Sequence, residues 1–360
     1  MEPKGSATHT AIGRLAFLDG VRAVAALVVV FQHTFEMLFP AFRQMTGTVF
    51  SFGQAGVTAF FLVSGFIIPF SLERVNDFKK FWIGRFFRLF PLYWSSLLVA
   101  TVFLLTIHAN KDPGQDGNFV RSLPTSFLIN MTMLQRYFGA PNAVGAYWTL
   151  GVELTFYALC SLLFLIKLNR HTFWVLLCFS AYFYFQIFRH HGPGIYFGSR
   201  MMTMGTFFAG TLLYRYWSGA TTLRTALLGL AIFVGPAVLY PFVSLLRGAH
   251  SPDPMTFAVL SGTIGGYLVF SAFFLRRETV FPAWLTKAGE ISYSIYLMHA
   301  TLLLLAIVFH GRIGSILTLI LTIPVSMLTY HKIEAPAMKF GRALMKRGSA
   351  PLEAKPAEAA

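Results

Sequence analysis

The chain has 360 residues, of which 56% are hydrophobic and only 12% are charged, and its mean hydropathy is +0.62. This composition exceeds what the core of a water-soluble domain can bury, so soluble globular classes are excluded. Long apolar runs recur roughly every 20 to 35 residues, which favours helical spans over barrel strands of about 9 to 11 residues. We therefore expect an all-α integral membrane protein.

The apolar runs predict about ten transmembrane helices. The predicted spans, in chain order, are residues 15–39, 48–72, 88–108, 146–168, 172–188, 201–217, 225–246, 255–275, 292–309 and 314–331. The first run is too long for the apolar part of a signal peptide and has no small-residue cleavage site. We interpret it as a retained first span.

The formal net charge of +15 is explained by how the basic residues are distributed. With the N-terminus inside, the inner connecting segments and their edges hold 20 Lys and Arg residues, and the outer ones hold 8. The positive-inside rule then predicts that both termini are cytoplasmic. Because the positive charges are spread over short loops rather than gathered on one soluble surface, we expect no nucleic-acid binding.

The chain is predicted to form one membrane domain, residues 12–345. A short cytoplasmic segment, 1–11, precedes it, and the tail 346–360 is rich in Ala, Pro and Glu and is expected to be a disordered cytoplasmic segment. The outer segment 119–138 has apolar residues at near-helical spacing, which predicts an amphipathic helix. This helix could roof a cavity or rest on lipid, and both interpretations stay open.

No spacing typical of a metal site occurs, so we expect no metal. His190 and His191 are adjacent in an outer loop beside Gly and Pro, and we interpret them as solvent-facing. Cys160 and Cys178 fall inside apolar spans, where they are predicted to be small packing residues rather than a disulfide or a metal pair.

The first span contains the ionisable residues Asp19, Arg22 and His33, although such a group costs about 2.5 to 3.5 kcal/mol at mid-membrane. Arg22 and His33 are eleven residues apart, so they share one helix face with about 16 Å between them along the axis. Arg22 could reach the inner edge with Asp19 as its partner. His33 lies deeper, as a candidate base or as a hydrogen-bonded core residue.

Arg85 and Arg88 lie at positions i and i+3 at the inner mouth of the third span. Two guanidinium groups on one face suit phosphates or a carboxylate. The alternative is that these arginines only anchor the helix at the inner membrane surface.

Glu153 lies about 9 Å below the outer start of its span, and His33 lies about 10 Å below the outer end of the first span. These matching depths allow a contact in which the carboxylate orients the imidazole. Glu36, one turn from His33 on the same helix, is the competing partner.

Two further polar positions lie in the last two spans. His299 is placed roughly 10 Å inside the inner mouth marked by Glu290, nearer in depth to Arg22 than to His33, with a structural or a functional role. Glu334, at the inner end of the last span, is expected to pair with a loop arginine.

Six stretches occur in a fixed order along the chain, namely LDGVRAVAALVVVFQH, GVTAFFLVSGFII, RFFRLFPLYW, YWTLGVELTFY, ISYSIYLMHA and IEAP. Taken together, they resemble the membrane-bound acyltransferase 3 family of bacterial polysaccharide O-acetylases. The resemblance covers nearly all of residues 15–336 and rests on an ordered set of motifs. The C-terminal SGNH-type domain that many relatives carry is not present in this sequence.

The resemblance implies a ten-helix enzyme of the bacterial inner membrane. It would move an acyl group from cytoplasmic acyl-CoA, by default acetyl-CoA, to a hydroxyl of a glycan or glycolipid acceptor. It also implies that Arg22 and His33 are essential and that Arg85 and Arg88 handle the acyl-CoA. Membrane lipid is the other expected partner, and no residue predicts the oligomeric state.

The residues and the resemblance suggest one mechanism. His33 removes the proton of the acceptor hydroxyl as it attacks the thioester, and Glu153 orients the imidazole or the sugar. Asp19, Glu36 and His299 are supporting residues. An acyl-histidine intermediate is the rival mechanism.

Two other classes of protein fit the composition. Ten helices with buried charges also describe transporters and flippases of lipid-linked sugars, although no inverted repeat is evident. A catalytically silent membrane scaffold would leave the buried polar residues without a purpose.

Overall fold

The computed structural model describes residues 15–108, 117–189, 200–246, 254–309 and 311–347. Within these ranges every regular element is a helix and no strand occurs, which confirms the predicted all-α class. The expected N-terminal segment 1–11, the loop histidines His190 and His191, and nearly all of the tail lie outside the described residues.

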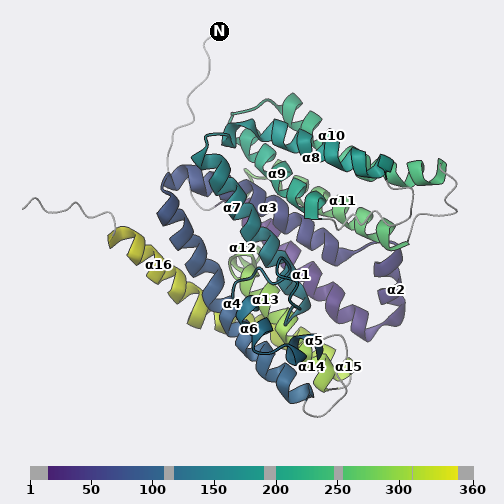
Figure 1. Cartoon of the computed structure of the whole chain (residues 1–360), viewed down its shortest axis with the longest axis vertical. Helices are drawn as coiled ribbons and strands as arrows, with labels where there is room; N and C mark the ends of the chain where they lie inside the picture. Colours follow the sequence, from purple (N-terminus) through teal and green to yellow (C-terminus); the bar gives the residue numbers. More distant parts are fainter. Residues whose placement is uncertain (1–14, 109–116, 190–199, 247–253, 310, 348–360) are drawn as a thin grey trace, which may run out of the picture.

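The helices are labelled in chain order in Figure 1. The α-helices are α1 Ala16–Leu38, α2 Pro40–Thr48, α3 Phe52–Val75, α4 Phe78–His108, α5 Gly117–Arg121, α6 Thr125–Asn130, α7 Trp148–Leu165, α8 Thr172–Arg189, α9 Arg200–Trp217, α10 Leu223–Leu246, α11 Pro254–Leu275, α12 Ala283–Glu290, α13 Ser292–Leu302, α14 Leu304–Val308, α15 Arg312–Thr329 and α16 Ala335–Arg347. Two 3₁₀ turns, η1 Gly145–Tyr147 and η2 Asn169–His171, and one π-helical turn, η3 Tyr330–Glu334, complete the set.

Each predicted span coincides with a helix or with a pair of consecutive helices. Among the described residues, six helices are long and apolar enough to cross a membrane, and the bent pair Ala283–Glu290 and Ser292–Val308 makes a seventh. The chain is therefore a multi-pass membrane protein. The other predicted spans fall on α8, α9 and α10, so the count of ten and the orientation of the termini stay predictions.

The ends of α3 follow from local sequence. Ser51 precedes the helix, and its hydroxyl accepts a hydrogen bond of 3.2 Å from the backbone N–H of Gln54. Asn76 follows the helix in the left-handed conformation, with φ of 47°. A helix is commonly capped by a hydroxyl side chain at its start. At its end it is commonly followed by a residue that tolerates positive φ. These caps fix the length of the helix that lines both cavities described below.

Small residues let the central helices approach closely. A Cβ at Gly65 of α3 would collide with the backbone of Phe207 in α9. A Cβ at Gly210 of α9 would collide with the backbone of Leu62 in α3. On α12, a Cβ at Gly289 would collide with the backbone of Asp19 in α1. Close backbone approach at small residues is how helices in lipid gain packing energy.

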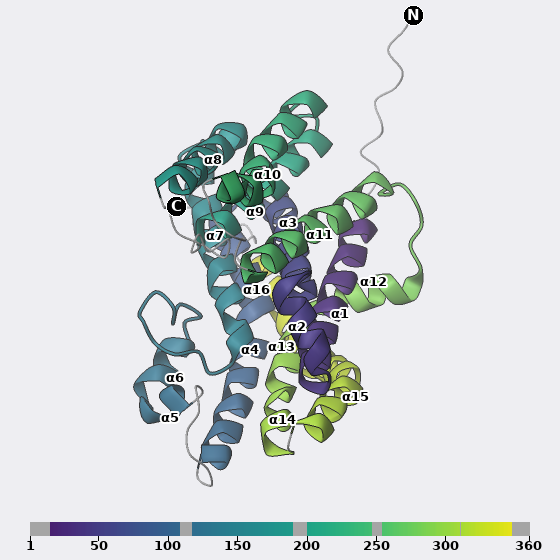
Figure 2. The same ribbon diagram turned by 90° about the vertical axis from the view of Figure 1, so that its right-hand side faces the viewer.

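The outer face of the bundle is apolar. On α4, Leu98 and Val102 are 58% and 56% exposed, whereas Leu97 and Leu104 on the opposite face are fully buried. Such a helix presents aliphatic side chains to lipid and packs its other face against protein. Figure 2 shows α5 and α6 beside α4, and α16 packs along α4 through the rings of Phe87 and Phe340, 5.2 Å apart.

Two predicted elements differ from the structure. α4 begins at Phe78, ten residues before the predicted span, so Arg85 and Arg88 lie about two turns inside a helix rather than at its start. The predicted amphipathic helix 119–138 is wrong, because Pro124 separates two short helices, α5 and α6, and turns follow Asn130. A proline cannot donate to the helical hydrogen-bond ladder, which explains the break.

Candidate active site

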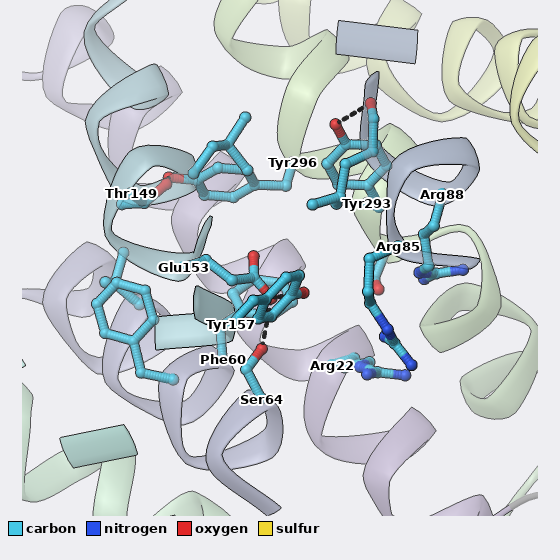
Figure 3. Close-up of a pocket in the computed structure, with 15 residues that line it drawn as sticks. Arg22, Phe60, Ser64, Arg85, Arg88, Thr149, Glu153, Tyr157, Tyr293 and Tyr296 are labelled. Atoms are coloured by element: carbon cyan, nitrogen blue, oxygen red, sulfur yellow. Dashed lines mark hydrogen bonds between the residues drawn. The ribbon is translucent and has the colours of Figure 1, made fainter. Parts of the chain in front are cut away.

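The three predicted arginines, Arg22, Arg85 and Arg88, line one cavity of about 70 Å³. Figure 3 shows their guanidinium groups gathered on one side of it. Helices α1 and α4 supply the arginines, and α3, α7 and α13 supply the other walls. These other lining residues are Val57, Phe60, Phe61, Ser64, Leu89, Thr149, Leu150, Glu153, Tyr157, Ser292, Tyr293 and Tyr296.

Acidic partners hold two of the arginines from outside the cavity. Arg22 pairs with Asp19 at 3.9 Å, and Arg88 pairs with Glu334 at 3.4 Å. Neither carboxylate lines the cavity. Arg85 donates instead to the hydroxyl of Ser71 at 2.8 Å. The lining therefore carries three guanidinium groups against a single carboxylate, which makes it a site for an anion.

That single lining carboxylate belongs to Glu153. Its Oε1 accepts hydrogen bonds from the hydroxyls of Tyr157 at 2.5 Å and Ser64 at 2.7 Å, as the dashed lines in Figure 3 show. The Arg85 guanidinium carbon lies 5.9 Å from the centre of the Tyr157 ring. Glu153 thus ties α7 to α3 and faces the arginines across the cavity.

His33 lines a second and larger cavity of about 380 Å³. Its polar side chains besides His33 are Gln32, Ser51 and Gln54, and Gln32 accepts a hydrogen bond of 2.5 Å from the backbone N–H of Gly53. The remaining lining residues are mostly apolar, namely Val29, Met37, Val57, Ala143, Val144, Gly145, Ala146, Trp148, Tyr296, Ala300, Leu303, Leu304 and Ile307.

Val57 and Tyr296 line both cavities and form the wall between them. The Tyr296 hydroxyl is hydrogen-bonded to Thr149 Oγ1 at 2.8 Å and donates to the carbonyl of Ala146 at 3.3 Å. In Figure 3 this hydroxyl pair lies across the cavity from the arginines. The arginine cavity and the His33 cavity are therefore neighbours that share two lining side chains.

The expected depth of His299 is wrong. Its imidazole stacks on that of His33, with 5.7 Å between ring centroids and 7° between ring planes. Helix α12 meets α1 where Gly289 touches Asp19, and α13 also packs against α1, which places His299 beside His33. His299 is fully buried.

The two candidate partners of His33 are now placed. Glu153 lines the arginine cavity and is not among the residues that line the His33 cavity, so the two side chains line different cavities. Glu36 lies one turn from His33 on α1, where its charge acts on the imidazole, and it accepts a hydrogen bond of 2.5 Å from Thr46.

The expected partner of Glu334 is also wrong. Glu334 is 1% exposed and pairs with Arg88 of helix α4, not with a loop arginine. Ser294 donates to its Oε2 at 2.6 Å. The π-helical turn Tyr330–Glu334 widens the helix by one residue there, and turns of this kind are frequent at functional sites.

The described residues contain no group of three or more His, Cys, Asp or Glu side chains that could hold a metal ion. Both cysteines are free, with Cys160 buried and Cys178 exposed. The packing role predicted for Cys178 is wrong, because its side chain is exposed.

Residues 15–331 match the model of the acyltransferase 3 family, which is described as an acyltransferase domain. The chain belongs to the acyltransferase 3 family. Membership makes it an acyltransferase and places it in a different class from the transporters and flippases that its composition also allowed. No solved structure matches the chain.

Three relatives illustrate the family. Along nearly its full length this acyltransferase is similar to Nodulation protein 10 of Rhizobium leguminosarum bv. viciae, with 25% identity over 374 residues, 95% of this chain and 98% of the relative. It is similar to Acyltransferase MdmB of Streptomyces mycarofaciens, with 28% identity over 152 residues, 40% of this chain and 38% of the relative. It is also similar to Peptidoglycan O-acetyltransferase OatA of Listeria monocytogenes serovar 1/2a, with 27% identity over 150 residues, 39% of this chain and 22% of the relative.

Sequence reasoning missed several residues of this acyltransferase site. Tyr157 follows Glu153 by four positions on one helix, a spacing that brings two side chains together and could have revealed the pair. Ser64, Val57 and Tyr296 carry no such signal, because an uncharged residue in an apolar span is ordinary. Only the packing of α3 against α7 and α13 brings them into the cavities.

Proposed function

We propose that this acyltransferase transfers an acetyl or other short acyl group from acyl-CoA to a hydroxyl of a glycan or glycolipid. In this proposal the donor binds in the arginine cavity and the acceptor binds in the His33 cavity. The observation that carries the proposal is that a cationic cavity and a histidine-lined cavity share the wall made by Val57 and Tyr296.

The donor assignment is supported by charge and by reach. Acyl-CoA carries phosphates, and the three lining arginines suit phosphate oxygens. Arg22 and His33 are about 16 Å apart along α1, a separation that the pantetheine arm would bridge. Because acyl-CoA is made in the cytoplasm, the arginine cavity would face the cytoplasm in a bacterial inner membrane.

The acceptor assignment is supported by the size and lining of the His33 cavity. Its volume of about 380 Å³ gives room for a sugar ring. Trp148 offers an aromatic face, and the amide of Gln54 offers both a donor and an acceptor for hydroxyl groups. Relatives include proteins named for O-acetylation of peptidoglycan.

The proposed reaction is a direct transfer. His33 takes the proton of the acceptor hydroxyl as the oxygen attacks the thioester carbonyl carbon, forming the C–O bond. The C–S bond then breaks, and the CoA sulfur leaves with the proton that His33 returns. Glu153, on the donor side, would position Arg85 through Tyr157 rather than orient the imidazole.

The test combines purified protein and cells. Purified protein is given acetyl-CoA labelled in the acetyl group, and surface polysaccharide from cells with and without the gene is compared by mass spectrometry. The proposal expects one mass shift that identifies both the acyl group and the acceptor. Unchanged surface glycans together with no consumption of any acyl-CoA would contradict it.

The rival mechanism, an acyl-histidine intermediate, has its own test. Protein is incubated with labelled acetyl-CoA without acceptor, denatured and digested. Direct transfer expects no label on His33, whereas a labelled peptide that contains His33 would replace it with the two-step route.

A further inference from the structure

The wall between the two cavities consists of side chains that are held in place. Tyr296 is 7% exposed, and its hydroxyl bonds fix it to Thr149 and to the Ala146 carbonyl. Its ring packs edge-on against Phe60 at 5.7 Å and against His299 at 5.5 Å. With contacts on its ring and at its hydroxyl, Tyr296 moves only when several interactions are broken.

Val57, on the other side of the wall, has little freedom either. It is 9% exposed on α3, and a β-branched side chain in a helix keeps one strongly preferred rotamer. The backbone beside Val57 cannot move toward α1. It already lies so close to α1 that a Cβ added at Gly56 would collide with the Ala25 carbonyl and with Val29. The gap between Val57 and Tyr296 therefore has fixed sides.

The two cavities differ in how much they restrict an acyl group. The His33 cavity, at about 380 Å³, is more than five times the volume of the arginine cavity at about 70 Å³. A longer acyl chain finds room once it has reached His33. The acyl group is therefore restricted most at the wall between the two cavities, and not in the His33 cavity that it enters.

We propose that Val57 and Tyr296 form a constriction that selects the acyl group by its size. This inference rests on the proposed function, in which the phosphates of the donor stay at the arginines. The acyl group is then the leading end of the arm and must pass the constriction first. An acetyl group passes with a small displacement of the wall, and each added methylene requires a larger one.

The test compares acetyl-CoA, propionyl-CoA, butyryl-CoA and hexanoyl-CoA as donors for one purified enzyme preparation. The measured quantity is the ratio of kcat/KM for each longer donor to kcat/KM for acetyl-CoA. A ratio within one preparation does not depend on the fraction of protein that is folded. One methylene in a tight apolar site changes such a ratio by about ten-fold or more.

Val57→Ala widens the constriction and is expected to raise the butyryl-to-acetyl ratio by about ten-fold or more. Val57→Ile narrows it and is expected to lower the ratio. Val144→Ala is the matched control, because Val144 lines the His33 cavity alone and loses the same atoms. Tyr296→Phe keeps the ring but loses both hydroxyl bonds, so its ratio is expected to rise less than that of Val57→Ala.

The outcomes separate the two proposals. An active enzyme whose ratio stays the same in Val57→Ala and Val57→Ile overturns the constriction and leaves the proposed function standing. An equal rise in Val144→Ala and Val57→Ala also overturns it, since cavity volume would then set the selectivity. A wild-type protein that transfers no acyl group from any of the four donors overturns both.

Discussion

The imidazoles of His33 and His299 lie nearly parallel, with 7° between their planes and 5.7 Å between their centroids. His299 Nδ1 lies 3.1 Å from the carbonyl of Ile295, and its Nε2 is buried without a hydrogen-bond partner. A proton on Nδ1 would satisfy that carbonyl and leave a lone pair on Nε2. His299 thus acts as a fixed, buried surface against which His33 rests.

This stacking predicts that the ring of His299 matters more than its nitrogens. His299→Ala would leave an empty space beside His33, so we expect a clear loss of kcat with a smaller change in KM for acyl-CoA. His299→Phe keeps a flat ring of similar size and is expected to retain more activity than the alanine variant. Steady-state kinetics of the two variants test this, and equal kcat values for the two would contradict it.

The ion pair of Arg88 and Glu334 predicts a rescue of stability without a rescue of activity. Arg88→Met leaves the buried Glu334 carboxylate without its cation, at a cost of roughly 3 to 5 kcal/mol. Adding Glu334→Gln removes that uncompensated charge, so the double variant should melt at a higher temperature than Arg88→Met alone. Its KM for acyl-CoA should stay raised, because the phosphate-binding cation is gone.

Thermal unfolding in detergent and donor titration measure these two effects separately. If the double variant melted no higher than Arg88→Met, the unpaired Glu334 carboxylate would not be the cause of the lost stability. If the double variant recovered the wild-type KM, Arg88 would not bind the donor.

A second ion pair lies away from both cavities and should affect stability alone. Arg215, 7% exposed, donates to both carboxylate oxygens of Glu73, at 3.0 Å and 2.5 Å. Tyr214 and Asn169 also donate to Glu73, each at 2.7 Å. Arg215→Met is expected to destabilise the protein by on the order of 3 kcal/mol, with KM for acyl-CoA unchanged in the protein that remains folded. A raised KM would show that this cluster shapes the donor site.

The contact of Gly289 with the backbone of Asp19 predicts a position at which one methyl group is harmful. Gly289→Ala must push α12 away from α1, at a cost of about 1 to 3 kcal/mol or more, and with it disturb the Asp19 and Arg22 pair. Gly47→Ala is the matched control, because a Cβ there meets nothing within 4 Å. We expect a lower melting temperature and a raised KM for acyl-CoA in the first variant and neither change in the second. Equal behaviour of the two would contradict the contact.

The sequence predicted much of the fold, because apolar runs and helix periodicity are local signals. The shared helix face of Arg22 and His33 is a property of one helix, and the structure keeps it by turning Arg22 into one cavity and His33 into the next. Charged residues in apolar runs were visible for the same reason. They stand out against their neighbours whatever the tertiary structure is.

Relations between helices could not be predicted in this way. The depths along two separate helices predicted that Glu153 lies level with His33. The Glu153 side chain instead lines the arginine cavity. Depth also separated His299 from His33, although α13 packs against α1 so that the two histidines stack. Such facts depend on crossing angles and close contacts, which no single helix encodes.

In the proposed mechanism the donor phosphates bind in the arginine cavity and proton transfer occurs in the His33 cavity, and one variant tests this directly. His33→Ala changes only the second cavity, so its affinity for acetyl-CoA, measured by calorimetry in detergent, should equal that of the wild type while transfer to the acceptor is lost. Arg85→Met should instead weaken the binding of acetyl-CoA, because Arg85 lines the donor cavity. If His33→Ala lost donor affinity, or if it still transferred the acyl group at the wild-type rate, the account of two adjoining sites would be contradicted.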